Sequence, residues 1–127
     1  MKEIKYNEIL SYNTKRKNCG DYSLGGFYLI KDNENNNIYV GRSIDVLLRL
    51  KQHIYCSKRK SGLEIDLHLS INPESFKYFI IESYINLKIN YFSRKLETIY
   101  ENTFINKFNT AYPSGLNYQY YDKLRIK

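Results

Sequence analysis

The stretch GGFYLIKDNENNNIYVGRS, residues 25 to 43, decides the fold of this chain. It holds two short apolar strings, GFYLIKD and NIYVGRS, and the run of Asn, Asp and Glu between them has the composition of a turn. We therefore predict two antiparallel strands joined through Asp32 to Asn37. Glycine stands near the outer end of both strings, and we expect Gly26 and Gly41 to serve close packing or turns.

Downstream of this hairpin, apolar spacing predicts helices and one further strand. The pattern becomes helical from Ser43 or Ile44, whereas LEIDLHLS, residues 63 to 70, fits a short helix or a strand. FKYFIIES, residues 76 to 83, predicts a central strand, and the four-residue spacing of apolar side chains predicts a helix over 93 to 108. We predict an α/β (α+β) fold, a small three-stranded antiparallel sheet flanked by helices in the order β-β-α-(α)-β-α.

The chain has 127 residues, which is typical of one domain. A hydrophobic fraction of 43% is too high for a disordered chain, and no apolar run is long enough to span a bilayer. We therefore expect a soluble, intracellular, cytoplasmic protein with no membrane partner. Residues 1 to 24 read as a polar lead-in with a short helix or strand near its start, residues 25 to 118 as the domain, and residues 119 to 127 as a short basic tail.

The formal net charge is +7, which is compatible with a polyanionic partner. Within residues 42 to 60 the one acid is Asp45, and the candidate DNA-contacting residues there are Arg42, Lys51, Lys58, Arg59 and Lys60. This strip is either a phosphate-contacting surface or a solvated helix face and loop. Arg42 by itself is either a phosphate contact or a surface arginine.

Polar side chains suited to phosphoryl chemistry fall on three of the predicted elements. Tyr28 and Tyr39 lie on the two strands, and pairing of 28 with 39 puts both phenols on one face, whereas a slip of one residue separates them. Arg49 and His53 lie one helical turn apart, and Glu101 lies on the last helix. In phosphodiester hydrolysis a base takes a proton from water, while a cation and a metal stabilise the charge on phosphorus.

These residues resemble, in order and spacing, the motifs of the GIY-YIG nuclease domain family. The two signature tripeptides correspond to GFY at residues 26 to 28 and to YVG at residues 39 to 41. The family's arginine, two helical turns after the second motif, corresponds to Arg49, and the histidine that often follows corresponds to His53.

The resemblance continues to the end of the predicted domain. ENTFINKFNT, which starts at Glu101, resembles the segment that carries the family's metal-binding glutamate, and GLNY with Asn117 resembles its closing turn. The likeness spans about residues 25 to 118. The departures are Phe27 in place of the usual isoleucine and Arg42 where serine or lysine is commoner.

The resemblance implies hydrolysis of DNA by a one-metal mechanism that leaves a 5′-phosphate and a 3′-hydroxyl. Tyr28 or Tyr39 would be the general base or relay to it, although a free tyrosine, with a pKa of about 10, needs a nearby cation for this task. Arg49 would stabilise charge on the scissile phosphate, and His53 would shuttle a proton or orient a tyrosine. Glu101 would bind one Mg²⁺ or Mn²⁺ ion.

Simpler alternatives stay open for several of these residues. Arg49 has the spacing to pair with Asp45, and His53 has the position of an ordinary polar residue at the flank of a helix. Glu97, one turn before Glu101, is the competing metal ligand. Asn117 supports either the fold or the metal shell.

The implied partner is DNA, with recognition supplied by an attached or separate DNA-binding part. The likeness is strongest to phage and intron-associated, homing-type members. The alternative function is a non-cleaving nucleic-acid-binding module that keeps the fold. Loss of Arg49 or Glu101 would favour that alternative, and the chain carries both.

Overall fold

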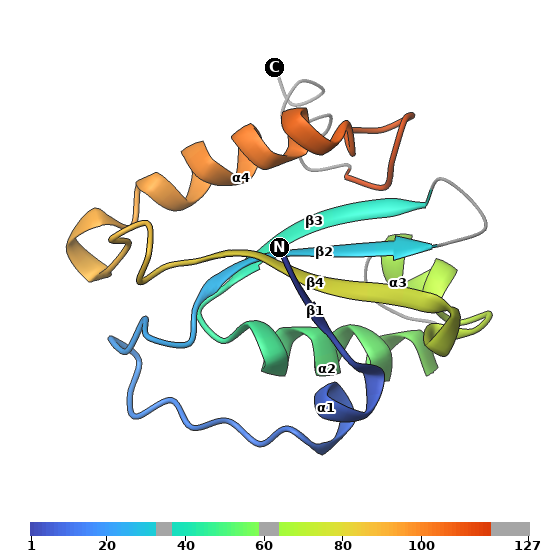
Figure 1. Cartoon of the computed structure of the whole chain (residues 1–127), viewed down its shortest axis with the longest axis horizontal. Coiled ribbons are helices and arrows are strands. Elements are labelled where there is room, and N and C mark those ends of the chain that lie inside the picture. Colours follow the sequence, from blue (N-terminus) through green and yellow to red (C-terminus); the bar gives the residue numbers. More distant parts are fainter. Residues whose placement is uncertain (33–36, 59–63, 118–127) are drawn as a thin grey trace.

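The computed structural model describes residues 1–32, 37–58 and 64–117 (Figure 1). Most of the predicted turn, the candidate DNA contacts Arg59 and Lys60, and the tail from 119 to 127 lie outside these ranges. The elements in chain order are β1 (Lys2–Ile4), α1 (Tyr6–Ser11), β2 (Gly26–Asp32), β3 (Ile38–Ser43), α2 (Val46–Lys58), α3 (Glu64–Leu69), η1 (Pro73–Ser75), β4 (Phe76–Ser83), η2 (Tyr91–Ser93) and α4 (Leu96–Phe108).

The strands form one antiparallel sheet in the order β1-β4-β2-β3. The α+β class and the order of elements after residue 25 are confirmed, but the predicted count of three strands is wrong. The fourth strand, β1, comes from the lead-in and pairs with β4, so that Ile4 lies opposite Tyr78. Three residues, of which only Ile4 is buried, show no alternation from which a strand can be recognised.

Helices cover both faces of the sheet, with α1, α2 and α3 on one side and α4 on the other (Figure 1). Successive residues of a strand point to opposite faces. Accordingly, Tyr28 and Ile30 of β2 belong to the core that includes α2 and α3 residues, whereas Phe27 and Leu29 pack in the clusters that include α4 residues. This burial on both faces explains why GFYLI is apolar throughout.

The lead-in is tied to the start of α2 by side-chain hydrogen bonds. The hydroxyls of Tyr12 and Thr14 donate to the two carboxylate oxygens of Asp45, at 2.9 and 2.5 Å. The Lys51 amine donates to the Tyr12 carbonyl oxygen at 2.9 Å. Asp45 also accepts from the Leu48 amide at 3.4 Å, the geometry of a helix N-cap. Residues 1 to 24 therefore help to hold α2, the helix that carries two predicted catalytic residues.

The ambiguous segment from 63 to 70 is settled by packing. It contains α3, whose Ile65 and Leu69 are fully buried against the core that includes α2 residues. The final helix begins at Leu96, three residues later than predicted, because η2 precedes it. Ser93 accepts a hydrogen bond from the Asn90 amide and closes that turn.

No helix in the described part of the chain is long and apolar enough to cross a membrane.

Candidate active site

The two motif tyrosines lie on the same face of the β2–β3 hairpin. The predicted register is wrong, because Tyr28 lies opposite Gly41 and Tyr39 lies opposite Ile30. The shift equals two residues, which is the side-chain period of a strand, so the shared face is preserved. The Tyr28 and Tyr39 ring centroids are 6.3 Å apart.

Glycine at position 41 makes room for Tyr28. A Cβ on Gly41 would lie 2.3 Å from the hydroxyl oxygen of Tyr28, so this ring occupies the space that any side chain would need. A Cβ on Gly26 would lie 2.7 Å from the Glu82 carbonyl oxygen. Both glycines therefore serve close packing, one of the two roles expected from the sequence.

His53 of α2 lies beneath Tyr28 and is fully buried. Its Nε2 is 2.7 Å from the Tyr28 hydroxyl, and its Nδ1 is 2.5 Å from Oδ1 of Asp66 on α3. Burial lowers the pKa of His53, although Asp66 acts in the opposite direction. The imidazole is therefore neutral near pH 7, with one nitrogen that donates and one that accepts.

The sequence-based prediction missed Asp66. The available signal was an acid in a segment of otherwise mostly apolar residues, LEIDLHLS, but that segment fitted a strand as well as a helix. In a strand Asp66 would face away from both Ile65 and Leu67, and nothing local would direct it toward His53. The contact depends on how α3 packs against α2.

Burial raises the pKa of both phenols in the unliganded protein, and the Glu101 carboxylate raises them further. Arg49 acts in the opposite direction on both, without reversing the shift. Tyr28 and Tyr39 are therefore protonated near neutral pH. Charges from α2 and α4 therefore act on the same two phenols, Tyr28 on β2 and Tyr39 on β3, the strand at one edge of the sheet.

Arg49, on α2, carries the positive charge that acts on both phenols. Its guanidinium makes a marginal hydrogen bond of 3.5 Å to the Gln52 side chain. It forms no ion pair with any residue in the described ranges, and Asp45, the alternative partner, instead accepts from Tyr12 and Thr14.

Glu101 is 6% exposed and already has a cation beside it. Arg42 places its Nε 3.2 Å from Glu101 Oε1 and its Nη1 2.9 Å from Glu97 Oε2. Arg42 is thus neither a simple surface arginine nor, in this state, free to contact phosphate. The two carboxylates lie one turn apart on α4 and attract one positive group between them.

This donor set fits a hard divalent ion. Mg²⁺ keeps several waters and is held by one or two carboxylates together with substrate phosphates. The Arg42 guanidinium lies between Glu101 and Glu97, so these two carboxylates already stabilise a positive charge at this position. The described residues contain no group of three or more His, Cys, Asp or Glu side chains that could hold a metal ion.

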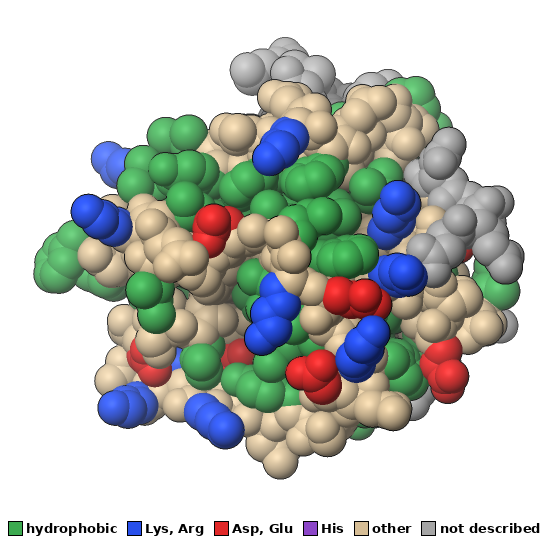
Figure 2. Space-filling view, in the orientation of Figure 1, with side chains coloured by type: hydrophobic (Ala, Val, Ile, Leu, Met, Phe, Trp, Pro, Cys, Tyr) green, Lys and Arg blue, Asp and Glu red, His purple; other side chains and the backbone are tan. Residues whose placement is uncertain are grey.

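The remaining predicted DNA contacts are spread along α2. Lys51 donates to the Tyr12 carbonyl, and Lys58 is the last residue of the helix. On the face visible in Figure 2, lysine and arginine side chains are scattered among acidic and apolar ones rather than gathered in one strip.

Asn117 supports the fold. Its Nδ2 donates to the Val40 carbonyl oxygen at 2.7 Å, and its Oδ1 accepts from the Val40 amide at 2.8 Å. The Thr110 hydroxyl also donates to Oδ1, at 2.6 Å. The buried amide therefore pairs with the exposed edge of β3 as a neighbouring strand would, and it holds the strand that carries Tyr39 and Gly41.

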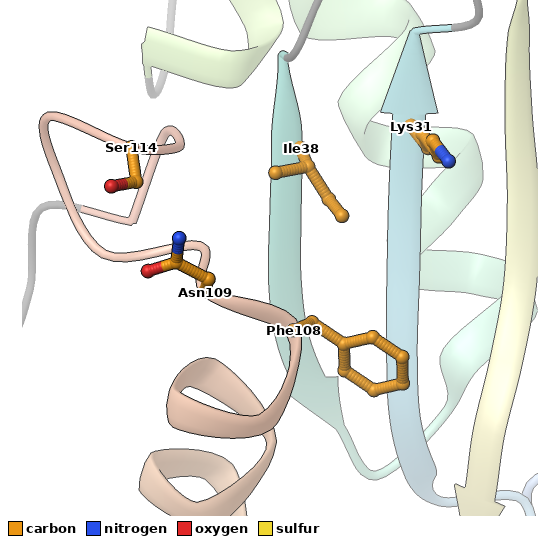
Figure 3. A pocket seen from close by; sticks show the side chains of 5 residues that line it. All are labelled: Lys31, Ile38, Phe108, Asn109 and Ser114. Carbon is orange, nitrogen blue, oxygen red and sulfur yellow. The ribbon is translucent and has the colours of Figure 1, made fainter.

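A separate hollow of about 410 Å³ lies between the end of the hairpin and the C-terminal end of α4 (Figure 3). The residues lining it are Lys31, Ile38, Phe108, Asn109 and Ser114. None of them is a predicted site residue, and Lys31 is the one ionisable side chain among them. We assign this hollow no catalytic role.

Comparisons with known proteins agree with this geometry. The model of the GIY-YIG catalytic domain family matches residues 24–117. The probable intron-encoded endonuclease 1 of Neurospora crassa is 28% identical over 111 residues, which make up 81% of this chain and 36% of that protein. The chain therefore spans only about a third (36%) of that relative's length.

Solved structures give the same result. The catalytic domain of the homing endonuclease I-TevI is similar with a TM-score of 0.60 and 26% sequence identity, covering 73% of this chain and 96% of that one. A mutant of the same domain is similar with a TM-score of 0.59 and 26% identity, covering 73% and 91% of the two chains.

Proposed function

The chain belongs to the GIY-YIG catalytic domain family of endonucleases, and from this membership we propose that it hydrolyses DNA phosphodiester bonds with one divalent metal ion. The observation that carries the proposal is the shared face of the Tyr28 and Tyr39 phenols, with the Tyr28 hydroxyl 2.7 Å from Nε2 of His53. Arg49 and Glu101 both shift the pKa of Tyr28 and Tyr39. A cation and a metal-binding carboxylate beside hydroxyl groups suit attack by water on phosphorus.

We assign the role of general base to Tyr28 rather than Tyr39. A buried phenol with a raised pKa is a poor base unless a neighbour accepts its proton. Tyr28 has such a neighbour, because His53 Nε2 lies 2.7 Å from its hydroxyl. His53 would take the phenol proton as the phenol takes a proton from the attacking water, and Tyr39 would orient that water.

Arg49 is the residue that stabilises the phosphate during attack. Its guanidinium stays charged at any working pH and presents donors in a geometry that matches two phosphate oxygens. With no ion pair to any described residue, the group needs no rearrangement of a protein partner before it meets the substrate.

Glu101, with Glu97 next to it, would hold the metal ion. The bound ion, Mg²⁺ or Mn²⁺, supplies neutralisation of the charge on the phosphate and the leaving 3′-oxygen. We propose that the ion displaces Arg42 from its 3.2 Å contact with Glu101, because the two cations compete for the same carboxylate. Its released guanidinium would then be available to a DNA phosphate, which is the role expected from the sequence.

The mode of DNA recognition follows from the relatives. Their names describe intron-encoded and homing endonucleases, which supports a mobile-element role, of intron or phage origin, for this chain. The chain matches 36% of the fungal relative, and we propose that an attached or separate domain supplies sequence recognition. Contacts from Arg42, Lys51, Lys58, Arg59 and Lys60 would be made to phosphates, so the affinity would be sensitive to salt and tolerant of sequence.

Plasmid cleavage tests the proposed function. The wild-type protein is expected to nick or cut supercoiled plasmid with Mg²⁺ and not with EDTA, leaving 5′-phosphate ends. Arg49→Ala is expected to lower the rate by about 10²- to 10³-fold, the usual cost of removing one group that stabilises the transition state. Arg16→Ala, which removes the same charge from the lead-in, is the control. DNA binding without cleavage by the wild type would establish the non-cleaving alternative.

The Arg42 ion pairs lead to a prediction about metal affinity. Arg42→Ser removes a positive charge that competes for Glu101, so Mn²⁺ is expected to bind about tenfold more tightly, through the lost repulsion between like charges. Titration calorimetry without DNA measures this directly. Arg16→Ser, which removes the same charge from the lead-in, is expected to leave the affinity unchanged. Equal or weaker binding by Arg42→Ser would show that the two cations do not compete.

A further inference from the structure

We propose that Asp66 is a positioning residue that holds His53 in the one tautomer able to accept the proton of Tyr28. The inference rests on the proposed function and adds to it a residue that neither sequence motif contains. It assigns a role to α3, which otherwise only packs against α2.

Three side chains from three elements form one continuous buried line. Tyr28 on β2 is 1% exposed, His53 on α2 is 0% exposed and Asp66 on α3 is 1% exposed. The two contacts along this line, 2.7 Å from Tyr28 to Nε2 and 2.5 Å from Nδ1 to Asp66, are of normal to short hydrogen-bond length.

The carboxylate determines where the imidazole proton sits. A carboxylate oxygen accepts hydrogen bonds, so the nitrogen that faces it donates, and Nδ1 carries the hydrogen. In a neutral imidazole the other nitrogen is then an acceptor. Nε2 faces the Tyr28 hydroxyl, which must donate to it. Without Asp66 the opposite tautomer would present an N–H to the phenol, and no proton could pass to His53.

The proton balance of the step is closed. The O–H bond of the attacking water breaks, its proton goes to the Tyr28 oxygen, and the phenol proton goes to His53 Nε2. The hydroxide forms the new bond to phosphorus, the bond to the 3′-oxygen breaks, and the leaving 3′-oxygen takes a proton from solvent water to become the 3′-hydroxyl. The imidazolium of His53 returns its proton to solvent after the product leaves, while Asp66 stabilises the positive charge in the meantime.

The position of Asp66 is enforced by its neighbours. Ile65 and Leu69 are fully buried and anchor α3 to the core that includes α2 residues. Asp66 is thereby held at the ring nitrogen of His53 that Tyr28 does not contact. A purely structural role, in which Asp66 only satisfies a buried histidine, predicts loss of stability on substitution but a wild-type cleavage rate for the variant that remains folded.

Nitrogen NMR of the wild-type protein is the first test. Long-range proton–nitrogen correlation spectra of His53 are expected to show Nδ1 protonated and Nε2 unprotonated at pH 7.5. The opposite tautomer in the wild type would overturn the proposal without any substitution. His68, which is partly exposed, provides an internal reference signal.

Asp66→Asn is the second test. The amide can donate to Nδ1, so the tautomer is expected to reverse, and the cleavage rate to fall by roughly 10²- to 10⁴-fold, as for the equivalent change in Ser-His-Asp hydrolases. Asp32→Asn, at another buried aspartate near the hairpin turn, is the control and is expected to keep the wild-type rate. A wild-type rate for folded Asp66→Asn would overturn the proposal.

The pH profile separates positioning from folding. The charged and titratable groups that act on His53 are Tyr28, Tyr39, Arg49 and Asp66. Asp66 raises the pKa of His53, so its removal lowers that pKa further and moves the acid limb of the rate to lower pH. A fall in rate with an unchanged acid limb would count against the proposal. Failure of the proposed function looks different, because the wild type itself would then not cleave DNA.

Discussion

Glu101→Gln is expected to lower metal-dependent DNA cleavage by about 10³-fold or more, because it removes the charged ligand of the metal ion. The substitution keeps the side-chain shape and an oxygen able to accept from Arg42, now 3.2 Å away. The protein should therefore fold and bind DNA as the wild type does. Manganese binding measured by calorimetry is expected to be lost together with cleavage.

Glu97→Gln is the matched control for this experiment. Glu97 lies one turn earlier on α4 and shares the same arginine, at 2.9 Å. We expect Glu97→Gln to reduce metal affinity only modestly, because Glu101 supplies the direct ligand. If the effects were reversed, with cleavage lost in Glu97→Gln and kept in Glu101→Gln, the metal ligand would be Glu97. Retained cleavage in both variants would remove the carboxylate pair from the mechanism.

Tyr28→Phe is expected to lower the cleavage rate by about 10²- to 10⁴-fold, the usual contribution of a general base. The ring still fills the space against Gly41, so packing is unchanged. The cost to stability is the unpaired acceptor on buried His53, about 1–3 kcal/mol. A domain with about 5–15 kcal/mol of stability remains folded. Single-turnover cleavage together with thermal unfolding measures both quantities.

Two further substitutions identify which phenol acts. Tyr39→Phe is expected to lower the rate less than Tyr28→Phe, because the described contacts of Tyr39 include ring packing on Tyr28 and His53 but no hydrogen bond to His53. Tyr78→Phe removes a hydroxyl on β4 that donates to the Pro73 carbonyl of η1, and it is expected to leave cleavage unchanged. A larger loss in Tyr39→Phe than in Tyr28→Phe would transfer the base to Tyr39.

Most of the fold was predictable from spacing along the chain. Strand-like and helix-like periodicity indicated β2, β3, β4 and α4, and packing placed their boundaries within a few residues. The missed strand, β1, is three residues long, so its strand character comes from pairing with β4 and not from its own pattern. The register of the hairpin was predicted two residues out, because alternation determines only which face a side chain occupies.

The candidate site, like the fold, was predictable from the sequence only in part. Motif positions predicted Tyr28, Tyr39, Arg49, His53 and Glu101 as candidate site residues, since each has a defined place on its own strand or helix. Asp66 and the ion pairs of Arg42 were not predictable. Asp66 is far from Tyr28 in sequence, and Arg42 meets Glu97 and Glu101 only because α4 packs over β3.

The sequence by itself thus determined the family, the order of elements and the residues available for chemistry. Tertiary structure decided the protonation geometry of His53, the cation that already neutralises Glu101, and the pairing of Asn117 with the edge of β3. The physical reason is that periodicity acts within one strand or helix, where backbone geometry repeats. Hydrogen bonds and ion pairs between elements depend on distances that only the packing of helices on the sheet defines.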